Sequence, residues 1–140
     1  MDMSDQLLPT VAYDLTDAFQ YEEQPGFTYK LHIDGQRVGG YVDNLEAYKQ
    51  AVYKILNTER YQYLIYSWNY GVELKELIGQ HIAYVVPEIE RRITEALMQD
   101  DRTESVDSFE FDTSKRGVVA VSFTAHSIYG DANIQTQVAI

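Results

Sequence analysis

Hydrophobic and polar residues alternate in two regions of the chain, and a period of two is typical of strands with one buried face. In the first region, residues 27–42, apolar side chains fall at every second position up to Asp34-Gly35, a pair typical of tight hairpin turns. The later pair Gly39-Gly40 indicates a bulge in the returning strand. We therefore expect a β-hairpin over 27–42. A turn at this position pairs Leu31 with Val38 and Phe27 with Val42.

The second alternating region is the C-terminal third of the chain. It divides into three runs, at 108–112, 119–126 and 133–140, with turn signals at 113–117 and 129–131. Such regular alternation predicts a sheet with one solvated face, which is typical of antiparallel strands. We expect a three-stranded meander.

Apolar residues at helical spacing predict helices between these two regions. Residues 44–56 follow Asp43, which suits an N-cap, and residues 72–78 predict a short helix that Gly79 ends. The longest helix is expected at 84–99, with Pro87 in or near its first turn. Its predicted buried stripe consists of Val85, Ile89, Ile93, Ala96 and Leu97. The predicted fold class is α+β, a mainly antiparallel sheet (N-terminal hairpin plus C-terminal meander) with two to three helices on one face.

Residues 61–68 are rich in aromatic and β-branched side chains, which predicts a strand or an extended segment. With residue 70 they form a dense aromatic cluster of Tyr61, Tyr63, Tyr66, Trp68 and Tyr70. Three interpretations remain open: buried core, a platform for sugars, or anchors of a protein interface. A mixture of core and interface is favoured, because alternation would place the rings on both sides of a strand.

Composition and charge narrow the function. The chain has 140 residues, no cysteine and a net charge of −11. Residues 1–26 hold six acids and no Lys or Arg, so we expect an acidic N-terminal arm followed by a single α+β domain at 27–140. Such a negative field disfavours nucleic acids and anionic membranes as partners.

The sequence offers little catalytic chemistry. The three histidines, His32, His81 and His126, lie far apart, and no nucleophile elbow or phosphate-binding loop occurs. No catalytic residue, metal or cofactor is therefore expected. A glycosidase would need two nearby carboxylates, for which Glu59, Glu73 and Glu76 beside the aromatic cluster are candidates. Decoration of an exposed helix face is the favoured interpretation of the last two.

Three stretches carry a resemblance to a known family: Ile55–Tyr61 with Asn57-Thr58-Glu59-Arg60, Ile65–Leu74 with Tyr66-Ser67-Trp68-Asn69-Tyr70-Gly71, and Arg91–Leu97. The sequence resembles the XkdS-like proteins of phages and phage-like elements. That family looks related to the wedge proteins of contractile-tail baseplates, a group also described as lysozyme-like.

The resemblance implies a structural, non-enzymatic component of a phage tail baseplate. Such a protein would be made in the bacterial cytoplasm and end in the virion, in several copies in a ring, against other wedge and tail proteins. The alternative is a peptidoglycan-degrading, lysozyme-like hydrolase of the tail.

The expected partner-binding residues are Glu59, Arg60, Tyr66, Trp68 and Tyr70. An Arg fork can grip a carboxylate or carbonyls of a partner. With equal weight, the Glu59-Arg60 pair serves only to tie the turn after the helix at 44–56.

Overall fold

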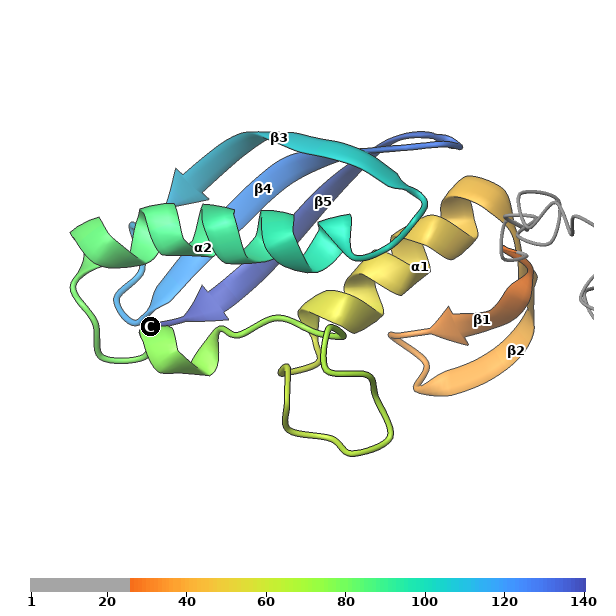
Figure 1. The fold of residues 1–140 in the computed structure, drawn as a ribbon, viewed down its shortest axis with the longest axis horizontal. Coiled ribbons are helices and arrows are strands. Elements are labelled where there is room, and N and C mark those ends of the chain that lie inside the picture. Colours follow the sequence, from red (N-terminus) through yellow and green to blue (C-terminus); the bar gives the residue numbers. More distant parts are fainter. Residues whose placement is uncertain (1–25) are drawn as a thin grey trace, which may run out of the picture.

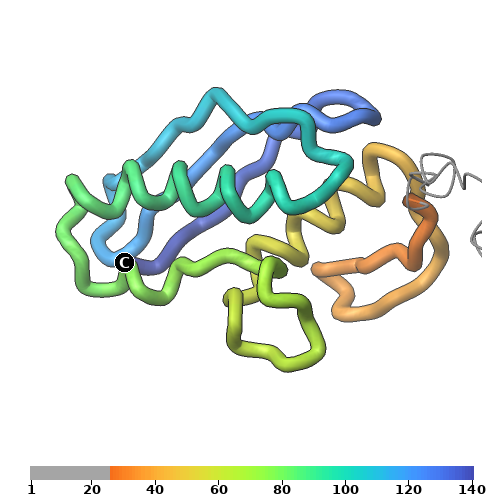
Figure 2. The backbone as a smooth tube through the Cα atoms, in the orientation of Figure 1, coloured from red at the N-terminus to blue at the C-terminus, as the bar shows by residue number. Residues whose placement is uncertain are grey.

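Two helices cover one face of a three-stranded sheet, and a two-stranded hairpin lies beside the first helix (Figures 1 and 2). The computed structural model describes residues 26–140, so the predicted arm lies, except for Gly26, outside the described residues. The elements in chain order are β1 (Thr28–His32), β2 (Arg37–Val42), α1 (Asn44–Leu56), the 3-10 helix η2 (Lys75–Leu77), α2 (Ile82–Met98), β3 (Thr103–Asp112), β4 (Val118–Ser127) and β5 (Gly130–Ala139). The predicted α+β class is confirmed.

The C-terminal meander is confirmed, with strands that are longer than predicted. Its order is β3-β4-β5, and both pairs are antiparallel. Along β4 every second residue from Val119 to Ser127 is buried, and the residues between are partly exposed. One face of the sheet therefore belongs to the core and the other meets solvent.

The core lies between this sheet and the helices. The predicted stripe of α2 is buried at all five positions, and α1 contributes Tyr48, Val52 and Ile55. Burial raises the pKa of Tyr48, whose hydroxyl forms a 2.8 Å hydrogen bond with the Thr103 hydroxyl. This bond satisfies a polar group inside the core and joins α1 to the start of β3.

Helix α2 begins two residues earlier than predicted, because the His81 side chain caps its N-terminus by accepting a bond from the Ala83 N–H. Pro87 consequently lies in the second turn, next to the first turn, in or near which it was expected.

The hairpin is confirmed with Leu31 opposite Val38, and Asp34-Gly35 lies at the centre of its turn as predicted. The turn spans Ile33–Gln36, and the positive φ of 48° falls at Gln36. An extra residue at the Gly39-Gly40 bulge shifts the register, so Val42 pairs with Thr28 and not with Phe27.

Two predictions between α1 and α2 were wrong. Residues 61–68 form no strand but an irregular series of turns, and the helix predicted at 72–78 is reduced to the single 3-10 turn η2. Within 72–78, Val72 and Leu77 are buried, whereas Ile78 is 56% exposed. The segment thus anchors at two points and leaves the aromatic residues outside the core.

Candidate protein-interaction site

The aromatic residues lie on a loop, residues 61–70, that is closed at its base by backbone hydrogen bonds. We call it the aromatic loop. Glu59 and Val72 form a parallel bridge, in which the Val72 N–H donates to the Thr58 carbonyl at 2.9 Å and the Arg60 N–H to the Val72 carbonyl at 3.3 Å. Gly71 makes this closure possible. Its φ is +97°, and a Cβ there would lie 2.5 Å from the Thr58 carbonyl oxygen.

Glu59 is engaged inside the molecule. Its carboxylate accepts hydrogen bonds from the backbone N–H groups of Leu74, at 3.4 Å, and Lys75, at 3.2 Å. These groups open the 3-10 turn that follows the loop, so Glu59 fixes where the chain leaves the loop.

Arg60 ties the base of the loop to α2. Its guanidinium donates to the Glu95 carboxylate at 3.2 and 3.3 Å and lies 3.5 Å from the Glu73 carboxylate. Only 12% of the side chain is exposed. Burial lowers the pKa of Arg60, but the hydrogen bond that Arg60 donates to Glu95 and the charge of Glu73 outweigh it, so the pKa is raised and the charge is kept.

A second arginine, Arg92 of α2, binds the residues that follow the aromatic loop. Its Nη1 donates to the Glu73 carbonyl at 2.7 Å and to the Glu76 carboxylate at 3.2 Å, while its Nε donates to Glu88 at 3.1 Å. The loop is therefore fastened at both ends to the most deeply packed helix.

The aromatic loop itself faces solvent. Every residue from 61 to 69 is exposed, and Trp68 is 79% exposed. The rings contact each other: Tyr66 stacks on Tyr70 at 4.5 Å between centroids, and Trp68 lies 5.7 Å from Tyr61. Exposed apolar rings that gather on one loop make this loop the candidate interaction site.

The five predicted site residues thus divide into two groups. Glu59 and Arg60 lie at the base and are bonded within the chain, whereas Tyr66, Trp68 and the partly buried Tyr70 lie on the loop. The prediction missed Leu64 and Ile65, which are the most exposed apolar side chains of the loop. Their signal was present as an apolar pair between tyrosines, but the strand interpretation assigned the two to opposite faces.

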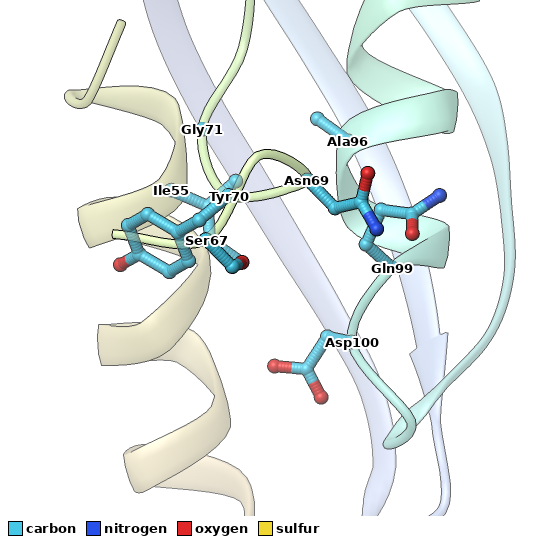
Figure 3. Close-up of a pocket in the computed structure, with 8 residues that line it drawn as sticks. All are labelled: Ile55, Ser67, Asn69, Tyr70, Gly71, Ala96, Gln99 and Asp100. Atoms are coloured by element: carbon cyan, nitrogen blue, oxygen red, sulfur yellow. The ribbon is translucent and has the colours of Figure 1, made fainter. Parts of the chain in front are cut away.

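A hollow of about 280 Å³ lies between the loop, α1 and the end of α2 (Figure 3). Its lining includes Ser67, Tyr70 and Asp100, without a histidine that could activate the Ser67 hydroxyl. Burial raises the pKa of Asp100, but hydrogen bonds from Arg102 outweigh burial and hold the pKa below its usual range. Asp100 therefore lines the hollow as an ionised carboxylate and not as a carboxylic acid.

The three candidate carboxylates do not form a glycosidase pair in one cleft. Glu59 faces backbone N–H donors, Glu73 faces Arg60 and Glu76 faces Arg92. A glycosidase needs two carboxyl groups that face the same cleft. A hollow of about 240 Å³ beside the loop is lined by Glu59 but by neither of the other two.

Within residues 26–140, no group of three or more His, Asp or Glu side chains is arranged to hold a metal ion. Over the same residues, no helix is both long and apolar enough to cross a membrane.

The fold and the loop define a small α+β protein with a rigidly mounted, exposed apolar surface, the kind of surface through which proteins bind each other. The family described as contractile injection system sheath initiators matches residues 24–130, and the chain belongs to this family. It is also 37% identical, over 134 residues, to the phage-like element PBSX protein XkdS of Bacillus subtilis (strain 168), a match that covers 92% of this chain and 94% of that protein. The expected XkdS-like family is confirmed, and with it a structural or assembly role in a phage contractile tail.

Proposed function

We propose that this protein is a non-enzymatic component of the baseplate wedge, which holds neighbouring tail proteins through its aromatic loop. It acts in several copies arranged in a ring and becomes part of the virion. The observation that carries the proposal is the loop itself, which is exposed from residue 61 to residue 69, bears several large apolar side chains and is fastened at its base by two arginines.

Rigid mounting supports this role energetically. Binding normally costs free energy for ordering loops and side chains. Here the closed base and the stacked rings order the loop before a partner arrives. Trp and Tyr are the residues on which interface binding energy concentrates. Trp68 and Tyr66 are therefore proposed as the contact residues, with Tyr70 as the support beneath Tyr66.

Glu59 and Arg60 have a different proposed role. Because both side chains are bonded within the chain, they act by positioning the loop. Direct contact of either residue with a partner stays a prediction. A partner contact through Arg60 would have to use the 12% of its side chain that is exposed.

The experiment is co-assembly of Trp68→Ala with the other tail proteins of the same gene cluster. Truncating an exposed side chain leaves the free energy of unfolding within about 0.5 kcal/mol of the wild type. We expect a fully folded protein whose incorporation into tails falls at least tenfold. Tyr84→Ala removes another exposed aromatic ring, from α2, and serves as the control. Wild-type incorporation of Trp68→Ala would contradict the proposed contact.

The non-enzymatic part of the proposal has its own test. Purified protein should release no product from peptidoglycan. Turnover that disappears in Glu59→Gln would instead favour the lysozyme-like alternative.

A further inference from the structure

In the described part of the chain, the three-stranded sheet has one face that neither helix covers (Figure 1). Its strands, β3, β4 and β5, carry five acidic residues and no Lys or Arg. Their one histidine, His126, is already bonded to Asp107 and Asp131. Solvated protein surfaces ordinarily mix charges of both signs. The negative charge of this uncovered face is therefore not balanced by Lys or Arg of the same strands.

The strand register places small side chains along the middle of this face, because residues that pair across strands share a face of the sheet. The outward residues Ala120, Ser122 and Thr124 of β4 lie between acids of β3 and amides of β5. The acids are Asp112, Glu110 and Asp107, and the amides are Gln137, Gln135 and Asn133, in the same order. The small side chains leave a hollow of about 380 Å³, whose lining includes Glu110, Asp112, Ala120, Ser122, Gln135 and Gln137. We call these six residues the acidic trough.

The two carboxylates of the acidic trough are available to a partner. Among residues 26–140, no group donates a hydrogen bond to the Glu110 carboxylate and no base forms an ion pair with it. Asp112 accepts a hydrogen bond from the Ser114 N–H at 2.9 Å, and Lys115 in the same turn forms no ion pair with it. Two negative charges therefore face the hollow without a basic partner in the described part of the chain.

The dimensions of the acidic trough suit a helix. β3 and β5 lie on either side of β4 and are therefore about 10 Å apart, since neighbouring strands are spaced by about 4.8 Å. An α-helix with its side chains has a diameter of about 10 Å. Ala120 and Ser122 leave room for a close approach, and the amides of Gln135 and Gln137 can donate and accept hydrogen bonds. A helix along β4 would cover the sheet from the second side.

Charge determines which class of partner fits. The negative face repels nucleic acids and anionic membranes. A second copy would bring a net charge of −11, and residues 1–25 of this chain would bring six acids without Lys or Arg. Lys and Arg side chains of another protein, in contrast, complement Glu110 and Asp112.

We propose that the acidic trough binds a basic helix of another tail protein, with Lys or Arg side chains of that helix at Glu110 and Asp112. The helix lies along β4, over Ala120 and Ser122. The trough shares no residue with the aromatic loop, so the inference stands whether or not the loop binds a partner. It requires only the role in a contractile tail that the family match shows.

Labelling of carboxylates with a carbodiimide and glycine ethyl ester tests whether the trough is covered. Labelling of Glu110 and Asp112 should be weaker by about fivefold or more in assembled tails than in the free full-length protein. Equal labelling in both would overturn the proposal. Weak labelling in the free protein would also overturn it, and would assign the trough to this chain itself or, where labelling depends on protein concentration, to a second copy.

Incorporation of Glu110→Gln/Asp112→Asn into tails tests the role of charge. Both exchanges keep the shape of the side chain, so the urea midpoint should stay at the wild-type value while incorporation falls by about tenfold or more. The matched control, Glu46→Gln/Glu90→Gln, removes two exposed carboxylates from α1 and α2 and should be incorporated like the wild type. Equal incorporation of the two double variants would overturn the proposal.

A steric variant tests the position of the helix. In Ser122→Trp an indole ring on the floor of the trough keeps a helix away from β4, so incorporation should fall although the urea midpoint shows a folded protein. Wild-type incorporation of Ser122→Trp would contradict a helix along β4.

Discussion

At the scale of residues, Gly71 determines the geometry of the loop base. Its positive φ alone would disfavour a side chain, and the Thr58 carbonyl occupies the place of a Cβ. Only glycine allows residues 58 and 72 to approach closely enough for the bridge that closes the aromatic loop.

Gly71→Ala should therefore lower the free energy of unfolding by more than the ~1–3 kcal/mol that backbone strain alone costs. Gly79→Ala is the matched control, because Gly79 also has a positive φ, of 83°, but nothing lies within 4 Å of its would-be Cβ. Urea unfolding of the two variants measures the difference. Equal losses would show that the close approach to Thr58 is unimportant.

Residue types alone could not predict the partners of the site. Arg60 was recognisable as a candidate anchor, but Glu95 lies 35 positions away, and only the packing of the loop against α2 brings them together. The same holds for Arg92 and the Glu73 carbonyl. Contacts between distant segments depend on the fold, so the spacing of residues along the chain does not predict them.

At the scale of elements, strongly periodic segments were predictable and the aromatic segment was not. The stripe of α2 and the alternation of β4 each repeat over several turns or pairs, so one face of each is unambiguous. Residues 61–68 have side chains that favour strands, but all eight residues are exposed, so no face of the segment packs against the core. Gly71 and the bonded Glu59 close them into a loop instead.

Three side chains, Asp107, His126 and Asp131, are hydrogen-bonded across all three strands of the sheet. We call this group the clasp. His126 of β4 lies between Asp131 of β5, at 2.6 Å from Nδ1, and Asp107 of β3, at 2.9 Å from Nε2. Hydrogen bonds to Asp131 and then Asp107 raise the pKa of His126 above its usual 6.5. The stabilisation from a raised pKa is complete below the unfolded value and is lost as pH rises through the folded value.

The free energy of unfolding of the wild type should therefore fall as the pH rises above 6.5. His126→Gln should not show this fall. The urea midpoints of both proteins at pH 6 and pH 9 give the measurement, with the difference expected to shrink at pH 9. His32→Gln, on β1 outside this sheet, controls for general effects of pH. A difference that is the same at both pH values would rule out the clasp.

Helix α2 carries a second titrating group, with the opposite sign. Hydrogen bonds from Arg91 and Arg92 lower the pKa of Glu88 to about 2. The stabilisation from a lowered pKa is present above the unfolded value, near 4.5, and is lost as pH falls toward 2.

Thermal unfolding of Glu88→Gln should accordingly differ from the wild type at pH 6 and converge with it near pH 2. Glu90→Gln, an exposed neighbour on the same helix, is the comparison. Persistence of the full difference at pH 2 would contradict the assignment.

At the scale of the whole molecule, the core and the exposed aromatic residues are separate. The helices and the sheet bury a continuous apolar cluster, while the aromatic loop and the hairpin rings of Phe27, Tyr29 and Tyr41 remain exposed. A fold that is complete without these residues leaves them available for partners, as expected of a member of the sheath initiator family.

The chain contains one tryptophan, so the fluorescence of Trp68 reports directly on whether the aromatic loop is buried against another tail protein. Incorporation of 5-hydroxytryptophan into this chain alone allows its fluorescence to be excited selectively in assembled tails. We expect an emission shift to shorter wavelength and at least fivefold weaker quenching by acrylamide than in the free protein, in which Trp68 is 79% exposed. Equal quenching in free protein and assembled tails would contradict it.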